Sequence, residues 1–373
     1  MTKEQEIKLG FIGCGGFGQF CLKVYWDIKE IKIVSVADIN EKLAKQTAWN
    51  FNCEWYKNPI TLIEESDVDL IHIATPPHLH FILSREALKR NKNVICEKPL
   101  ALSLQEADEI IAIAKEKELI LPVNFILRYI PITDSMQKII KSKILGEPLH
   151  AYFENYATDE LLNQEHWFWD KNKSGGILIE HGVHFFDLYN YWLGKANVVY
   201  AHAEIRPRTR QEDRVTCLLK FRSGVVANHY HGFDQPGCLD RSTHKILFER
   251  GDITIRGWIP ESIIVNAIIS NGHLEELRNI FPESTVTILE EFDRTNGEMK
   301  GRGKAIRADK MIRLYYNSPL TKENLYAKGI EGLVIDQINY IKGKDHKRII
   351  TEKNGRDALA LAVKASNMIT QQD

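Results

Sequence analysis

Residues 7–18 of the chain read IKLGFIGCGGFG, and this stretch decides the fold of the N-terminal region. Ile7–Ile12 is short and mostly apolar, which predicts a buried strand. It leads into Gly13-Cys14-Gly15-Gly16-Phe17-Gly18, a G-x-G-x-x-G pattern, and a helical pattern follows to about Lys29. Such a pattern between a strand and a helix indicates the phosphate-binding turn of a dinucleotide-binding unit.

The individual residues of this turn and the acid that follows it fit that interpretation. Gly13 permits a tight turn, Gly15 lets the backbone approach a pyrophosphate, and Gly18 allows close packing of helix and strand. Asp38 lies 20 residues after Gly18, where a carboxylate accepts hydrogen bonds from ribose hydroxyls and repels a 2′-phosphate. The next two residues carry no positive charge. The sequence therefore favours NAD over NADP as the cofactor, held by Gly13, Gly15, Gly16, Phe17, Gly18 and Asp38.

Strands and helices alternate through the first third of the chain, which predicts a parallel sheet with helices on both faces. We expect a Rossmann domain over residues 1–124, with further strands at 31–37, 54–56, 69–74 and 94–96 and a last one at 120–124. The helices between them are expected at 41–49, from 80 to about 90, and at 104–117.

After residue 124 the pattern changes to runs of strands with few helices between them, which predicts a second α/β domain over residues 125–373 with a mostly antiparallel sheet. Strands are expected at 149–156, 198–205, 215–221, 225–230, 245–249 and 253–255, with a hairpin turn at 221–225. Helices are expected at 131–143, 322–341 and 354–370, and one continuous helix at 174–193. We expect the final helix to pack back on the Rossmann domain, and the pattern predicts no structure for 271–304.

Composition excludes several classes of protein. The 373 residues carry a net charge of −1 and 27% charged residues, so nothing suggests attraction to nucleic acid or to a membrane surface. The six cysteines are scattered without a C-x-x-C pair, which indicates neither a disulfide framework nor a cysteine zinc site. We expect a cytoplasmic protein that spans no membrane.

Two stretches outside the glycine loop carry chemistry. Residues 94–99 read VICEKP, so a strand ends abruptly in an acid, a base and a proline. Residues 174–187 read SGGILIEHGVHFFD, which on a helix places Glu180, His184 and Asp187 on one face. Histidine suits proton transfer near neutral pH, and a nearby carboxylate would orient its ring. The alternative is a polar stripe that faces water. We expect no metal, because the spacing of His181 and His184 is not that of a zinc-binding helix.

Taken in order, these motifs resemble one family of oxidoreductases. The matching residues are Gly13–Gly18, Thr75-Pro76 with His80, Glu97-Lys98-Pro99, Asn124 with Arg128 and Pro131, and Gly175-Gly176 through Glu180, His184 and Asp187. They resemble the glucose–fructose oxidoreductase / inositol dehydrogenase / rhizopine catabolism (Gfo/Idh/MocA) family. The resemblance implies a Rossmann domain followed by an α/β domain that binds substrate, with a large sheet that often serves oligomerisation. It also implies oxidation or reduction of sugars, cyclitols or their derivatives by a pyridine nucleotide.

The resemblance also implies roles for residues. Lys98 matches the lysine beside the nicotinamide and the substrate hydroxyl, and His184 matches the proton-transferring histidine. Glu180 stands where dehydrogenase members commonly carry aspartate. The nicotinamide end would be lined by Thr75, Pro76, His80, Glu97 and Asn124, and the candidates for binding substrate hydroxyls are Arg128, Tyr156, His166, Trp167 and Trp169.

Three functions fit these residues. The first is an NAD-dependent dehydrogenase acting on a secondary alcohol, working as a homodimer or homotetramer. The second is a glycosidase that oxidises its substrate transiently with bound NAD. The third is an NAD-binding sensor without turnover.

Overall fold

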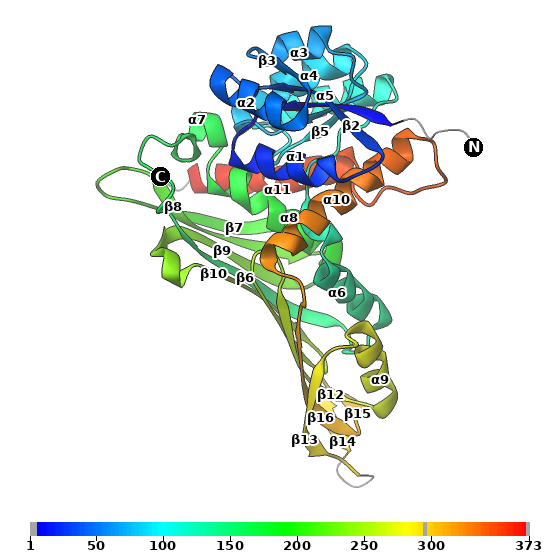
Figure 1. Cartoon of the computed structure of the whole chain (residues 1–373). Helices are drawn as coiled ribbons and strands as arrows, with labels where there is room; N and C mark the ends of the chain where they lie inside the picture. The colour runs from blue at the N-terminus through cyan, green and yellow to red at the C-terminus, as the bar shows by residue number, and fades with distance from the viewer. Residues whose placement is uncertain (1–5, 294–296, 371–373) are drawn as a thin grey trace, which may run out of the picture. The chain divides into compact units, whose positions relative to one another are not determined.

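The computed structural model describes residues 6–293 and 297–370, and these form two compact units (Figure 1). Unit 1 combines the N-terminal residues as far as Ile126 with two later segments, Gln164–Asp187 and Ala327–Ser366. Unit 2 contains Leu127–Asn163, Leu188–Tyr326 and the residues after Ser366. The domain boundary at residue 124 stays a prediction, because each unit is assembled from several segments of the chain.

Unit 1 is built on a parallel sheet with the strand order β3-β2-β1-β4-β5. The order reverses at β1, and ligands of such sheets bind at that point, beyond the carboxyl ends of the strands. The predicted Rossmann fold is confirmed. Its strands are β1 (Ile7–Ile12), β2 (Ile31–Ala37), β3 (Glu54–Tyr56), β4 (Leu70–Ile73) and β5 (Asn93–Cys96). Its α-helices are α1 (Gly16–Trp26), α2 (Glu41–Phe51), α3 (Pro59–Glu65), α4 (His80–Lys89), α5 (Leu104–Glu116) and α11 (Glu352–Thr370), which runs past the last residue of the unit.

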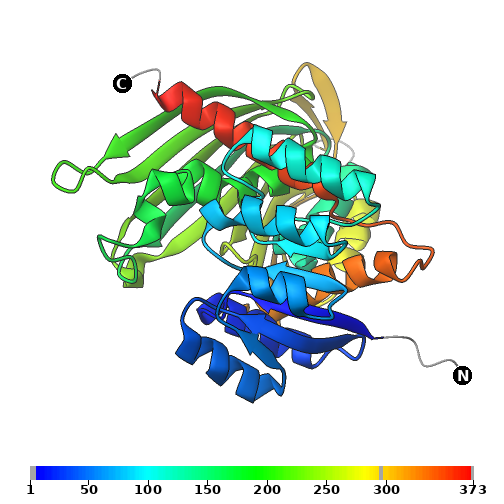
Figure 2. The same ribbon diagram turned by 90° about the horizontal axis from the view of Figure 1, so that it is seen from above.

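The C-terminal helix α11 lies along α5 (Figure 2). Arg356 binds Asp108 of α5 through two hydrogen bonds of 2.9 and 3.1 Å. Glu352 accepts the backbone N–H of Leu121 at 2.9 Å. These contacts join residues more than 200 positions apart in the sequence.

The strand expected at 120–124 is wrong as a separate element. The segment lies beside β5, and its carbonyl groups accept backbone hydrogen bonds from Val94 and Cys96. It forms only an isolated bridge, between Cys96 and Val123. Pro122 has no N–H to donate to a ladder, which explains the interruption.

Unit 2 is built on a nine-stranded sheet in the order β13-β16-β12-β11-β10-β6-β9-β8-β7, in which β6 and β9 are parallel and the other pairs antiparallel. This confirms the predicted second sheet. The strands are β6 (Pro148–Thr158), β7 (Ala196–Ile205), β8 (Glu212–Phe221), β9 (Val226–Gln235), β10 (Arg241–Phe248), β11 (Gly251–Arg256), β12 (Ser262–Ile269), β13 (Thr285–Glu291) and β16 (Lys310–Asn317), with a separate pair β14 (Glu298–Gly301) and β15 (Lys304–Arg307).

One face of this sheet is covered by α6 (Pro131–Ser142) and by the part of α8 (Val183–Leu193) that belongs to unit 2. Tyr189 of α8 donates its hydroxyl to the Tyr152 carbonyl of β6 at 2.7 Å, and Trp192 donates to the Thr133 carbonyl of α6 at 3.2 Å. Figure 1 shows α9 (Asn271–Ile280) near the end of the sheet that carries β13 and β16. Helix α10 (Lys322–Ile341), most of which belongs to unit 1, agrees with its prediction.

Candidate active site

Two glycines of the loop after β1 have no room for a side chain. Gly13 has φ +104°, and a Cβ there would lie 2.2 Å from the Ala74 carbonyl oxygen. A Cβ on Gly18 would lie 2.0 Å from the Gly13 carbonyl oxygen. Gly15 and Gly16 are exposed, and a Cβ on either would meet nothing within 4 Å. The loop is therefore packed tightly underneath and bare on its outer side, which fits a phosphate group resting on its backbone.

The start of α1 is also left open for an anion. Its N-cap, Gly15, supplies no side-chain hydrogen bond, and the first turn contains no acidic residue. The first N–H groups of a helix have no partner within the helix and carry a partial positive charge. The 11-residue helix thus offers donors to a pyrophosphate.

Asp38 follows β2 and faces the glycine loop. Its Oδ2 accepts the backbone N–H of Cys14 at 2.8 Å, and its Oδ1 accepts that of Asn40 at 2.8 Å. Each carboxylate oxygen can accept a second hydrogen bond. The carboxylate is held in place with capacity left for two hydroxyl groups, and the neighbouring side chain, Ile39, is 78% exposed. These residues fit the adenosine end of a dinucleotide.

His80 is fully buried at the start of α4 and joins two loops. Its Nδ1 lies 2.6 Å from the Pro99 carbonyl oxygen and its Nε2 lies 2.8 Å from the Thr75 carbonyl oxygen. Burial lowers the pKa of His80, while the two carbonyls and the Glu97 carboxylate oppose that shift. The ring thus fixes the backbone after β4 against the backbone after β5, and reaches no open surface. Thr75 Oγ1 is buried with no hydrogen-bond partner among the described residues.

Glu97 and Asn124 meet at the carboxyl end of β5. Asn124 donates its Nδ2–H to Glu97 Oε1, which also lies 3.3 Å from Nε2 of His72 in β4. Both residues are buried, and Asn124 Oδ1 has no partner within the described chain. A buried amide oxygen without a donor is costly unless a ligand supplies one. The pair therefore fits a ligand that brings N–H or O–H groups to this strand end.

Lys98 contacts the segment that carries the predicted histidine. Its ammonium donates to the Glu180 carboxylate and, at 3.1 Å, to the Glu180 carbonyl oxygen. Lys98, Glu180 and His184 all belong to unit 1, although Glu180 lies 82 residues after Lys98. The structure therefore brings the predicted acid, Glu180, onto the Lys98 ammonium.

His184 is partly exposed, with its ring near that of Phe125 at 6.1 Å between centroids. Burial lowers the pKa of His184 well below its ordinary value, and the Lys98 ammonium lowers it further. Nδ1 is shielded and has no hydrogen-bond partner among the described residues. The imidazole is therefore neutral at pH 7 and can accept a proton, which is the state a general base requires.

The helix expected at 174–193 begins three residues later, at Ile177, and is not α-helical throughout. A short helix α7 (Lys171–Ser174) ends at Gly175, which has φ +81°, and Gly176 has φ +90°. The chain then forms a π-helical turn η4 (Leu178–Gly182) before α8 begins. A Cβ on Gly175 would lie 2.6 Å from Ile179, so the break needs glycine. Widened turns of this kind are frequent at functional sites, and this one carries Glu180.

The five substrate candidates are divided between the two units. His166, Trp167 and Trp169 lie in unit 1, where the short helix η3 (Trp167–Trp169) follows His166. Arg128 and Tyr156 lie in unit 2. The Arg128 guanidinium lies 4.8 Å from the centre of the Tyr191 ring, and Arg241 lies 4.5 Å from that of Tyr156.

Two residues of the site were missed by sequence reasoning. His72 lies in the middle of a buried strand of isoleucines and leucine, and Tyr25 lies on the buried face of α1. The signal available for His72 was a polar residue in the run LIHI. Apolar side chains around Tyr25 gave no signal for a hydrogen bond.

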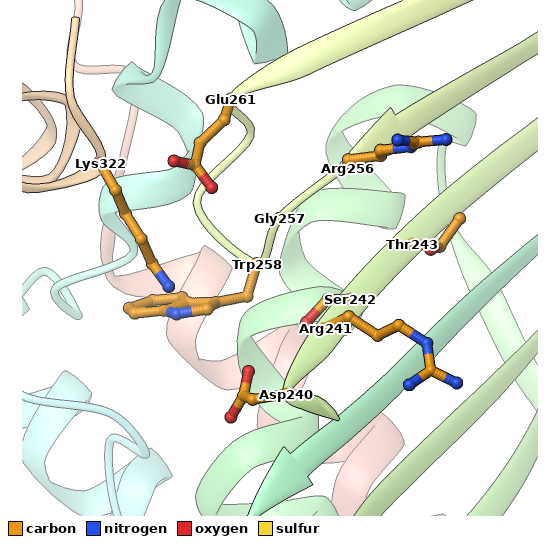
Figure 3. A pocket seen from close by; sticks show the side chains of 9 residues that line it. All are labelled: Asp240, Arg241, Ser242, Thr243, Arg256, Gly257, Trp258, Glu261 and Lys322. Atoms are coloured by element: carbon orange, nitrogen blue, oxygen red, sulfur yellow. The ribbon is translucent and has the colours of Figure 1, made fainter. Parts of the chain in front are cut away.

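A separate pocket of about 420 Å³ lies in unit 2 (Figure 3). Lys322 places its ammonium 5.7 Å from the centre of the Trp258 ring. Side chains of both charges line the pocket, and none of them belongs to the predicted site; they are Asp240, Arg241, Ser242, Thr243, Arg256, Trp258, Glu261 and Lys322, with Gly257.

The described residues contain neither a metal-binding cluster nor a membrane-spanning helix. Within residues 6–293 and 297–370, no three histidine, cysteine or acidic side chains are grouped as a metal ion would require. No helix in the same part of the chain is long and apolar enough to cross a bilayer.

Comparison with known proteins agrees with this geometry. Residues 7–125 match the family described as "Oxidoreductase family, NAD-binding Rossmann fold", and residues 133–254 match the Gfo/Idh/MocA C-terminal domain. The chain belongs to the Gfo/Idh/MocA family. This confirms the resemblance found in the sequence, and as a member of the family the protein is an NAD(P)-dependent oxidoreductase.

Individual proteins resemble the chain at a distance. The scyllo-inositol 2-dehydrogenase (NAD(+)) of Bacillus subtilis is 26% identical over 60% of this chain and 67% of its own length. The WlbA dehydrogenase of Bordetella pertussis, solved with NADH and UDP-GlcNAcA, has a TM-score of 0.81 at 17% identity and covers 100% of this chain and 98% of its own. Biliverdin reductase of Synechocystis, solved with biliverdin and NADP+, has a TM-score of 0.70 at 16% identity, covering 98% and 99%.

Proposed function

We propose that the protein is an NAD-dependent dehydrogenase that oxidises, or in reverse forms, a secondary alcohol of a sugar, a cyclitol or a derivative. The observation that carries the proposal is the Lys98 ammonium held by Glu180 next to a neutral His184, in the same compact unit as the glycine loop. When bound, the nicotinamide supplies the hydride acceptor or donor. The substrate class is supported by relatives such as the inositol dehydrogenase.

The residues would divide the proton chemistry between them. His184 takes the hydroxyl proton through Nε2, since Nδ1 is shielded, while Lys98 holds the substrate oxygen and stabilises the negative charge that develops on it. Glu180 keeps the Lys98 ammonium in place with its carboxylate and its backbone carbonyl. The lysine is thereby oriented before substrate arrives, so the reaction does not bear the entropic cost of orienting it.

NAD is the proposed cofactor, with NADP disfavoured by Asp38. Its carboxylate is fixed by the N–H groups of Cys14 and Asn40, and it would repel a 2′-phosphate. Thr75, Pro76, Glu97 and Asn124 would hold the nicotinamide end. The ratio of the dissociation constants for NADH and NADPH tests this choice, and tighter binding of NADPH would overturn it.

Substrate hydroxyls would be bound by Arg128, Tyr156, His166, Trp167 and Trp169, which supply donors and aromatic faces. We further propose a cytoplasmic homodimer or homotetramer. Light scattering on purified protein measures the mass of the assembly, and a monomer at micromolar concentration would contradict this part.

One experiment separates the proposed function from its two alternatives. The protein is incubated with NAD and a panel of polyols and glycosides, while absorbance at the NADH band and release of free sugar are followed. Net NADH formation supports the dehydrogenase, glycoside cleavage without it supports a hydrolase that uses transient oxidation, and NAD binding alone supports a sensor. Lys98→Met and His184→Ala variants serve as controls, and unchanged turnover in both would exclude the mechanism above.

A further inference from the structure

A row of buried polar side chains crosses the interior of unit 1, from α1 through β4 to the end of β5. The Tyr25 hydroxyl lies 2.8 Å from Nδ1 of His72, and Nε2 of His72 lies 3.3 Å from Glu97 Oε1. Tyr25 and His72 are completely inaccessible to solvent, and Glu97 is 8% exposed. The row ends at the carboxylate where the nicotinamide is proposed to bind.

The geometry gives each polar atom of the row a partner. Glu97 Oε1 accepts from Asn124, and it can also accept an N–H from Nε2 of His72. Nδ1 of His72 lies within hydrogen-bond distance of the Tyr25 hydroxyl. Burial raises the pKa of Tyr25 well above its usual value, so that its hydroxyl stays protonated.

The two carboxylate oxygens of Glu97 differ in their hydrogen bonding. Oε1 receives the donors from Asn124 and His72, while Oε2 makes no hydrogen bond within the described part of the chain. The Glu97 side chain keeps 11% of its surface exposed. The carboxylate is therefore oriented with one oxygen inward and the other available to a ligand.

Packing alone does not account for His72 and Tyr25. The His72 ring lies 4.7 Å from the Phe11 ring, in a strand whose other residues are apolar, so an apolar side chain would fill this position without needing a partner. Burying polar groups stabilises a protein by only about 1 kcal/mol per hydrogen bond even when every partner is present. His72 contacts Tyr25 through Nδ1 and Glu97 through Nε2, so the row of hydrogen bonds ends at the Glu97 carboxylate.

We propose that His72 is a positioning residue of the cofactor site, and that Tyr25 and His72 together aim Glu97 Oε2 at an N–H or O–H donor of the bound nicotinamide nucleoside. The inference rests on the proposed function. The orientation of the Glu97 carboxylate then depends on Tyr25 of α1 and His72 of β4, which touch neither cofactor nor substrate.

The test is a double-mutant cycle read out as the dissociation constant of NADH, measured by fluorescence titration. Tyr25→Phe removes one hydroxyl and keeps the ring, and we expect it to weaken NADH binding about 3- to 10-fold, the effect of one misplaced hydrogen bond. In a Glu97→Ala background the same substitution should change binding less than about 2-fold, because its effect acts through Glu97. Equal effects in the two backgrounds would overturn the proposal.

Two controls separate positioning from stability. Tyr189→Phe removes a tyrosine hydroxyl of unit 2 that donates to the Tyr152 backbone carbonyl. This variant should lower the melting temperature without changing the affinity for NADH. His72→Gln keeps an N–H donor for Glu97 and should retain tighter binding than His72→Leu, which keeps the bulk alone. Identical affinities in these two variants would contradict the proposal, whereas a wild-type protein that binds no NADH would refute the proposed function itself.

Discussion

The buried histidines of the two units differ in their surroundings. In unit 1, His72 and His80 contact hydroxyl, carboxylate and carbonyl oxygens at the ends of β4 and β5. In unit 2, His229, His231 and His244 are completely buried under α8 among the rings of Phe153, Tyr189 and Trp192. The first group carries polar connections to the proposed site, and the second fills an aromatic core. In this protein the buried histidines with oxygen contacts lie beside the proposed site, and the other three lie in the core beneath the second sheet.

The largest expected effect concerns the histidines of unit 2 in acid. Burial lowers the pKa of His231 and of His244 to about 3, and that of His229 well below its ordinary value. The unfolded chain binds protons on these histidines near pH 6.5, so the free energy of unfolding falls as the pH drops below that value. At pH 5 each buried histidine should lower the free energy of unfolding by about 2 kcal/mol, and the three together by about 6 kcal/mol.

Denaturant unfolding at pH 7.5 and pH 5.0 measures this loss of stability. A His231→Leu variant should lose about 2 kcal/mol less than the wild type between the two pH values. The same loss in both proteins would show that His231 is not held neutral in the folded state, and the contrast between the units would then fail.

The next largest effect is expected for His184, the histidine beside Lys98. His184→Ala should reduce turnover about 10²- to 10⁴-fold by removing the proton acceptor, while the affinity for NADH and the melting temperature change little. Because the pKa of His184 is lowered, the wild-type rate of alcohol oxidation should begin to fall only well below pH 6.5. A steep fall in the rate of alcohol oxidation between pH 7 and pH 6 would show that a group other than His184 controls the loss of activity in acid.

A smaller effect is expected for His80, which joins the loops after β4 and β5. His80→Leu keeps bulk but removes the ring N–H, and since a neutral imidazole carries one N–H, either the Thr75 or the Pro99 carbonyl loses its donor, at a cost of about 1–3 kcal/mol in stability. The displaced loops should also raise the KM for NAD. Lost stability with an unchanged KM would show that His80 serves the fold alone and would move it into the class of the unit 2 histidines.

The smallest effect is expected for an exposed histidine. His202 in β7 lies 3.1 Å from Glu204, with about half of its side chain accessible. An exposed side-chain contact of this kind contributes at most about 1 kcal/mol, so His202→Ala should change the free energy of unfolding by less than that and leave turnover unchanged. A loss of stability as large as that expected for the buried histidines would mean that burial is not what separates the histidine groups.

Much of unit 1 could be predicted because its signals are local. The strand, glycine turn and helix of residues 7–26 follow from apolar runs and from glycines that a short turn requires. Asp38 and Lys98 were found because each directly follows a predicted strand. In unit 2 the segment 271–304 gave no pattern, although it forms α9, β13 and β14, since its strands are short and largely exposed and lack an apolar alternation.

By itself the sequence determined the fold class, the family and the residues that bear titratable groups near strand ends, because these depend on residue type and short spacing. Only the tertiary structure decided which of them meet. It delayed the start of the expected helix to Ile177, after Gly175 and Gly176, both with positive φ, and at Gly175 Ile179 leaves no room for a Cβ. It also brought Glu180 to Lys98 and His72 to Glu97, because contacts between distant segments depend on how whole elements pack and leave no trace in local periodicity.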